Sequence, residues 1–118
     1  MPRLKTAILI SGRGSNLQAL IAACADPAFP AEIVGVISNR PNAPGLEHAR
    51  AAGIATAVVD HKAYADRLAF EAALDTVLKE AQAELICNAG FMRILTAGFV
   101  ERWRDRCLNI HPSLLPAF

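Results

Sequence analysis

Hydrophobic positions along this chain follow two periods that alternate with each other. Runs with a continuous or every-second-residue apolar pattern predict strands, and runs with apolar residues every three to four positions predict helices. The expected strands cover Lys5–Ser11, Glu32–Ser38, Ile54–Val59, Leu85–Leu95 and Leu108–His111. The expected helices cover Leu17–Cys24, Leu46–Ala52, Tyr64–Ala83 and Ala97–Arg106. Such alternation predicts an α/β fold, a Rossmann-like parallel sheet with helices on both faces.

Composition indicates one small domain over residues 1–118. The chain is 53% hydrophobic, which is enough for a packed core, and its formal net charge is +1. It has no run of Lys or Arg, so we expect no nucleic acid partner. The apolar run Ala7–Ile10 is too short for a signal peptide or a membrane span, so we expect a cytoplasmic protein without a membrane partner.

Cysteine and histidine spacing predicts no metal. Cys24, Cys87 and Cys107 lie far apart and are odd in number, which also argues against a disulfide framework and indicates reduced thiols. His48 and His61 have no Cys, Asp or Glu at ligand spacing, and we expect both at the surface.

A glycine-rich turn joins the first expected strand to the first expected helix. Backbone amides at Gly12 and Gly14, together with the helix N-terminus, favour an anion there. Leu17 stands where a dinucleotide-binding turn needs a third glycine, and no Gly-Lys-Ser/Thr follows. The turn therefore favours a single phosphate over NAD or ATP, and a plain tight turn capped by Ser or Asn is the alternative.

The last expected strand ends in an amide and an imidazole. Asn109 and His111 alternate with Leu108 and Ile110 until Pro112 stops the strand. Ligands of α/β sheets bind at the carboxyl ends of the strands, so this end and the glycine turn are expected to face one crevice. The alternative is a strand end whose polar residues are only solvated.

Upstream, the run Phe91–Leu95 is either ordinary core or the wall of an apolar slot for a flat ligand. Arg93 lies within it, and its charge must reach solvent or an anionic partner.

Three segments resemble the phosphoribosylglycinamide formyltransferase family: Ile10–Leu17, Ala89–Leu95 and Asn109–Pro116. They occur in the family's order and run through nearly all of the chain. The family transfers a formyl group from 10-formyltetrahydrofolate to the amine of 5-phosphoribosylglycinamide, in purine biosynthesis. The resemblance implies the formyltransferase fold with its C-terminal part missing, needs no metal, and leaves room for a homodimer.

Roles follow from the resemblance residue by residue. It assigns the ribose phosphate of the nucleotide to Gly14, Ser15 and Asn16. It assigns the folate to Arg67, Met92, Arg93, Ile94, Leu95 and Asn109.

Catalysis is assigned in the same way to Asn109 and His111. The amine attacks the formyl carbon, and an amide donor and a protonated imidazole can stabilise the developing oxyanion and manage protons. The family's catalytic Asp falls beyond Phe118, so we expect the isolated segment to bind nucleotide weakly and to catalyse poorly. Asn88 departs from the apolar residue that the family usually has against the pterin, which could alter folate affinity.

Two related enzymes share the Asn-Ile-His-Pro-Ser motif and remain alternatives. Methionyl-tRNA formyltransferase needs a basic tRNA-binding region that this chain does not show. Formyltetrahydrofolate hydrolase carries an extra N-terminal domain. A non-catalytic phosphate-binding module, in which His111 is structural, is the alternative from another class.

Overall fold

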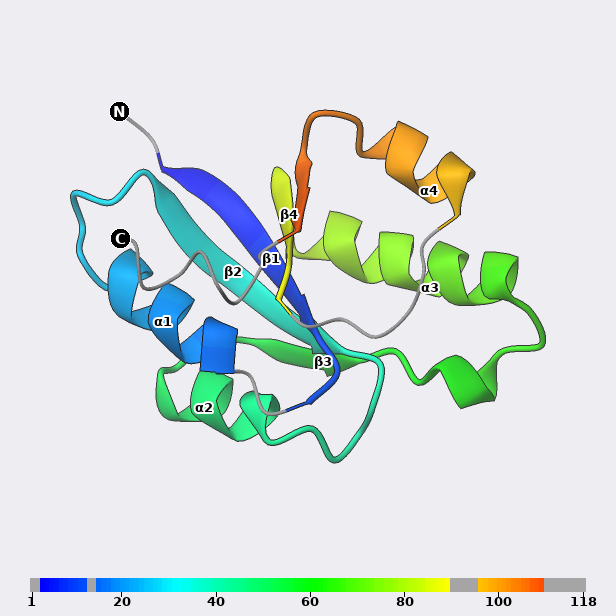
Figure 1. The fold of residues 1–118 in the computed structure, drawn as a ribbon, viewed down its shortest axis with the longest axis horizontal. Coiled ribbons are helices and arrows are strands. Elements are labelled where there is room, and N and C mark those ends of the chain that lie inside the picture. The colour runs from blue at the N-terminus through cyan, green and yellow to red at the C-terminus, as the bar shows by residue number, and fades with distance from the viewer. Residues whose placement is uncertain (1–2, 13–14, 90–95, 110–118) are drawn as a thin grey trace.

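The computed structural model describes residues 3–12, 15–89 and 96–109 (Figure 1). The strands in these ranges are β1 (Leu4–Ile10), β2 (Ala31–Ser38), β3 (Thr56–Val58), β4 (Leu85–Asn88) and β5 (Cys107–Asn109). The helices are α1 (Ser15–Cys24), α2 (Gly45–Ala51), α3 (Arg67–Glu80) and α4 (Ala97–Arg102), with a 3-10 turn η1 at His61–Ala63. All strand pairs are parallel, in the order β3-β2-β1-β4-β5. This confirms the predicted Rossmann-like parallel sheet.

The central strand β1 divides the core into two layers. Its side chains alternate between the faces of the sheet: Ala7 and Leu9 belong to one apolar cluster, and Ile8 and Ile10 to the other. All four are at most 1% exposed. A strand buried on both faces explains why its sequence reads as a continuous apolar run.

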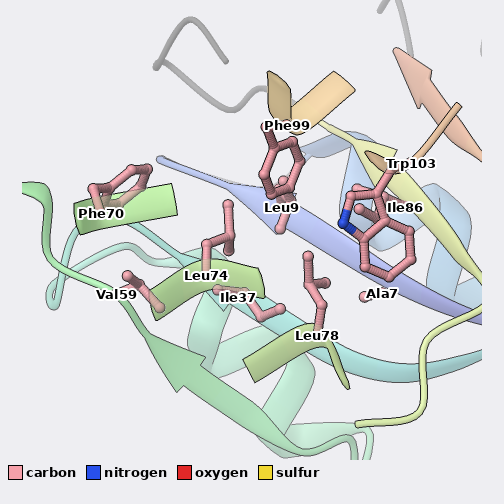
Figure 2. Packing of buried hydrophobic residues seen from close by; sticks show 10 residues of the cluster. All are labelled: Ala7, Leu9, Ile37, Val59, Phe70, Leu74, Leu78, Ile86, Phe99 and Trp103. Carbon is pink, nitrogen blue, oxygen red and sulfur yellow. The ribbon is translucent and has the colours of Figure 1, made fainter. Parts of the chain in front are cut away.

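Helices α3 and α4 cover one face, and α1 and α2 cover the other (Figure 1). Figure 2 shows the cluster under α3 and α4, which comprises Ala7, Leu9, Ile37, Val59, Phe70, Leu74, Leu78, Ile86, Phe99 and Trp103. The cluster under α1 and α2 comprises Ile8, Ile10, Leu17, Val36, Ala43, Leu46, Ala49, Cys87 and Ala89. None of the helices in the described ranges is long and apolar enough to cross a membrane.

Two predicted helices are too long at their ends. The helix predicted over 64–83 starts at Arg67, because the side chain of Asp66 accepts a hydrogen bond from the Ala69 N–H at 2.8 Å and caps the helix. The helix ends at Glu80, and the backbone of Gln82 is left-handed, with φ of 60°. The helix predicted over 97–106 ends at Arg102, and Asp105, with φ 62°, turns the chain towards β5.

Predicted strand lengths differ from the structure in a similar way. The strand predicted over 54–59 is shorter in the structure, Thr56–Val58, which is the part that pairs with β2. The strand predicted over 85–95 ends at Asn88 within the described residues, and positions 90–95 lie outside them.

The stability of a Phe99→Ala variant tests the packing of the core under α4. The Phe99 side chain is fully buried, so Phe99→Ala removes apolar contacts and leaves a cavity. We expect the free energy of unfolding in urea to fall by about 3–5 kcal/mol. Val100, the next residue of α4, is 47% exposed, and Val100→Ala should change stability by less than about 0.5 kcal/mol. Equal losses in the two variants would contradict this packing.

Candidate functional site

The strand register brings three carboxyl ends together. Asn88, the last residue of β4, lies opposite Leu9 of β1 on one side and Asn109 of β5 on the other. Gly12 follows three residues after Leu9. The start of the glycine turn and the backbone of Asn109 therefore share one edge of the sheet, as the sequence predicts, with Asn88 between them.

The predicted site residues are described to different extents. The structure gives the backbone of Ser15 and Asn16 at the start of α1 and of Asn109 at the end of β5. It places Arg67 as the first residue of α3, with its side chain exposed. The remaining predicted site residues, Gly14, Met92, Arg93, Ile94, Leu95 and His111, lie outside the described residues.

Backbone hydrogen bonds hold the start of the glycine turn. The Gly45 N–H, at the beginning of α2, donates to the Gly12 carbonyl at 3.1 Å. The Asn39 N–H donates to the Ile10 carbonyl at 3.4 Å, just before the turn. The end of β1 is thus fixed by the segment that follows β2.

Beside this turn lies a buried polar cluster that the sequence analysis missed. Ser11 and Asn39 are 2% and 1% exposed, and the Ser11 hydroxyl donates to Asn39 Oδ1 at 2.5 Å. Asn39 Nδ2 lies 3.3 Å from His61 Nδ1 and donates to it when that nitrogen carries no proton. His61 is held by Asn39, and both histidines that were expected at the surface, His48 and His61, are partly exposed. The sequence signal was the polar end of β2 at Ser38-Asn39-Arg40, but the partners of Asn39 are distant in sequence: Ser11 follows β1, and His61 lies in η1.

A cavity of about 590 Å³ opens over this cluster. It lies beyond the carboxyl ends of β1, β2 and β3, and its wall includes Gly12. Arg40 and Lys62 also line it, and both are exposed. Asp60, the acidic residue of the wall, accepts a hydrogen bond from the Lys62 N–H at 3.0 Å. The edge of the sheet beside the glycine turn thus carries more basic than acidic charge.

Asn88 contributes a polar atom that the described structure leaves unpaired. Its side-chain oxygen Oδ1 is buried and has no hydrogen-bond partner within the described ranges. Buried acceptors almost always have a donor. Asn88 Oδ1 is therefore a candidate acceptor for a ligand at this edge.

The cysteines of the described core are poor nucleophiles. Burial raises the pKa of the Cys87 thiol to about 11, and the nearby Cys24 and Cys107 add to the rise. Burial also raises the pKa of Cys107. It raises the pKa of Cys24 as well, although the positive charge of Arg3 lowers that pKa in part. All three are free thiols and stay protonated near neutral pH. No group of three His, Cys, Asp or Glu side chains within the described part could hold a metal ion.

Comparison with known proteins gives consistent matches. A family model described as formyl transferase matches residues 4–118. The chain is 54% identical over 116 residues to the trifunctional purine biosynthetic protein adenosine-3 of Gallus gallus, covering 98% of this chain and 12% of that protein. It is 45% identical over 114 residues to the phosphoribosylglycinamide formyltransferase of Haemophilus influenzae, covering 97% and 54%.

A solved structure agrees. The phosphoribosylglycinamide formyltransferase of Brucella melitensis superposes with a TM-score of 0.91 at 49% identity, over 99% of this chain and 61% of that one. The chain therefore spans about half the length of the single-function relative from Haemophilus influenzae and a small part of the trifunctional protein.

Thiol labelling tests the burial of Cys87. At pH 8, about three units below its pKa, about one Cys87 thiol in a thousand is ionised. We expect iodoacetamide to label Cys87 more slowly than the partly exposed Cys24, as measured by mass spectrometry of peptides. In urea the sites should react at similar rates. Equal labelling of Cys87 and Cys24 in the folded protein would show that β4 is more accessible than described.

Proposed function

The chain belongs to the formyl transferase family, and from this premise we propose that it is the phosphate- and folate-binding part of a phosphoribosylglycinamide formyltransferase. In this proposal residues 1–118 belong to one formyltransferase domain and correspond to about half of the single-function relative from Haemophilus influenzae. The observation that carries it is the 45% identity, over nearly the whole chain, to a protein with that name. The same similarity favours it over the related tRNA formyltransferase and the folate hydrolase.

The proposed reaction moves a formyl group from 10-formyltetrahydrofolate to the amine of 5-phosphoribosylglycinamide. The amine attacks the formyl carbon and forms a tetrahedral intermediate. When the intermediate collapses, the bond to N10 of the folate breaks, the former amine loses a proton and N10 gains one. We place the reaction in the cytoplasm, where free thiols such as those of this chain stay reduced.

We assign the ribose phosphate to the glycine turn, with Gly14, Ser15 and Asn16 as its ligands. Helix α1 begins at Ser15 and has no acidic residue in its described first turn. The free N–H groups and the positive dipole end of such a helix favour a phosphate. The basic wall beside Gly12, with Arg40 and Lys62, favours the same charge.

Catalysis is assigned to Asn109 and His111. The register of β5 against β4 supports this, because it brings Asn109 to the edge that carries the glycine turn. An amide N–H₂ and a protonated imidazole would donate to the oxyanion of the tetrahedral intermediate. The imidazole would also transfer the proton between the amine and N10.

The formyl donor is assigned to Arg67 together with Met92, Arg93, Ile94, Leu95 and Asn109. Arg67 is exposed in the first turn of α3, whose described residues there include no acid. Its guanidinium can form charge-assisted hydrogen bonds with carboxylates, and the glutamate part of folate carries such groups. The buried Asn88 Oδ1 would accept a hydrogen bond from the pterin.

A formyl-transfer assay on the full gene product tests the reaction. We expect turnover of 10-formyltetrahydrofolate with 5-phosphoribosylglycinamide, and little turnover by residues 1–118 alone. His111→Ala should lower kcat at least about 100-fold, because it removes the proton donor. His48→Ala is the matched control, since His48 lies on α2 and contacts Gln18 Nε2 at 3.1 Å. A folded gene product that binds the nucleotide but transfers no formyl group would favour the binding module.

Arg67 tests the donor site separately. We expect Arg67→Ala to raise KM for the formyl donor by about tenfold, the effect of losing a hydrogen bond to a charged group, and to leave KM for the ribonucleotide unchanged. Arg50→Ala controls for the loss of an exposed guanidinium, because Arg50 pairs on α2 with Glu47 at 2.6 Å. A donor KM that rises equally in both variants would refute the role of Arg67.

A further inference from the structure

Glu71 is an unusual residue on the buried face of α3. The face includes Phe70, Leu74 and the carboxylate of Asp75, and Glu71 is the most deeply buried acidic residue on it, at 1% exposed. Burying a carboxylate is costly, and an apolar residue of similar size is often at least as stable at such a position. A buried Glu therefore calls for an explanation beyond packing.

Both carboxylate oxygens of Glu71 accept hydrogen bonds from one residue. Oε2 accepts from the Thr96 backbone N–H at 2.6 Å, and Oε1 accepts from the Thr96 hydroxyl. Thr96 Oγ1 in turn accepts from the Phe99 N–H at 3.3 Å and caps α4. Glu71 thus connects the middle of α3 with the start of α4, across 25 residues of sequence.

This connection joins the two parts of the chain that are assigned to the formyl donor. Arg67 lies one helical turn before Glu71 on α3. Thr96 directly follows Leu95, the last residue of the proposed folate segment. A bidentate contact to one backbone N–H and one hydroxyl sets both the distance and the orientation between α3 and Thr96.

We propose that Glu71 is a positioning residue for the formyl donor, because it fixes Thr96, which follows the proposed folate segment in the sequence, relative to Arg67. The inference rests on the proposed function. Glu71 acts through Thr96 and is not expected to touch the reacting atoms. Its loss should weaken binding of the donor and leave binding of the ribonucleotide at the glycine turn unchanged.

Asp75 provides a matched control on the same helix. It lies one turn after Glu71, is 8% exposed, and accepts a hydrogen bond from Trp103 Nε1 at 2.8 Å. It also pairs with Lys79 at 3.2 Å and Arg102 at 3.6 Å. Asp75 therefore also holds α3 to the α4 region, but through the far end of α4 rather than through Thr96.

The test uses the full gene product with Glu71→Gln and Asp75→Asn. Both variants should be less stable to urea. Glu71→Gln places an N–H₂ group opposite a hydrogen-bond donor of Thr96. It should raise KM for 10-formyltetrahydrofolate at least about fivefold and keep KM for the ribonucleotide within about twofold of the wild-type value. Asp75→Asn should leave both KM values within about twofold of the wild type.

Variants at Thr96 keep the test decisive if Glu71→Gln fails to fold. Thr96→Ser retains the N–H and the hydroxyl and should behave as the wild type, whereas Thr96→Val loses the hydroxyl and should raise the donor KM. A donor KM that is unchanged in Glu71→Gln and Thr96→Val, or raised equally in Asp75→Asn, would overturn the inference alone. A folded wild type without formyl transfer would overturn the proposed function and the inference together.

Discussion

Burial of β1 on both faces is the constraint on which the rest of the structure depends. Four consecutive residues, Ala7 to Ile10, exclude water almost completely, so each face of the sheet needs its own layer of helices. The connections through α1 and α2 supply one layer, and those through α3 and α4 supply the other. Strands β2 and β4 flank β1, and helices cover both of its faces. Polar groups next to β1 can therefore reach a ligand at its carboxyl end.

Polar groups that are buried in this molecule concentrate around that end. Ser11 and Asn39 satisfy each other there, and Asn88 Oδ1 lies beside them in the register without a described partner. Each such group costs free energy unless it is hydrogen-bonded. Elsewhere in the described core, the buried polar side chains are those of Thr6, Glu71 and Asp75, and all three form hydrogen bonds. Within the part of the chain that the structure describes, this acceptor without a partner distinguishes the proposed ligand edge from the rest of the interior.

The sequence predicted the fold well because periodicity is a local property. The apolar run of β1 is visible in the sequence itself. Gly53 is the residue type that usually ends a helix, and its backbone is left-handed after α2, with φ 76°. The ends of α3 and α4 could not, because Gln82 and Asp105 adopt left-handed backbone conformations that their residue types do not demand. The roles of Asn39 and Glu71 were also missed, because their partners lie 28, 22 and 25 positions away. Of the candidate site, the sequence alone indicated the glycine turn and the Asn109 edge, and the resemblance supplied Arg67.

The strand order fits the proposal that one edge of the sheet binds two ligands. From β1 the chain moves outward through β2 to β3, and it then returns to the other side of β1 to form β4 and β5. The connections that leave β1 and β4 therefore diverge onto opposite faces of the sheet, as Figure 1 shows for α1 and α4. A crevice forms between neighbouring strands where the order reverses in this way. Leu9 and Asn88 pair at that reversal. A phosphate on the β1 side and a folate on the β4 side would then meet where β5 brings Asn109, the geometry that transfer of a group between two substrates requires.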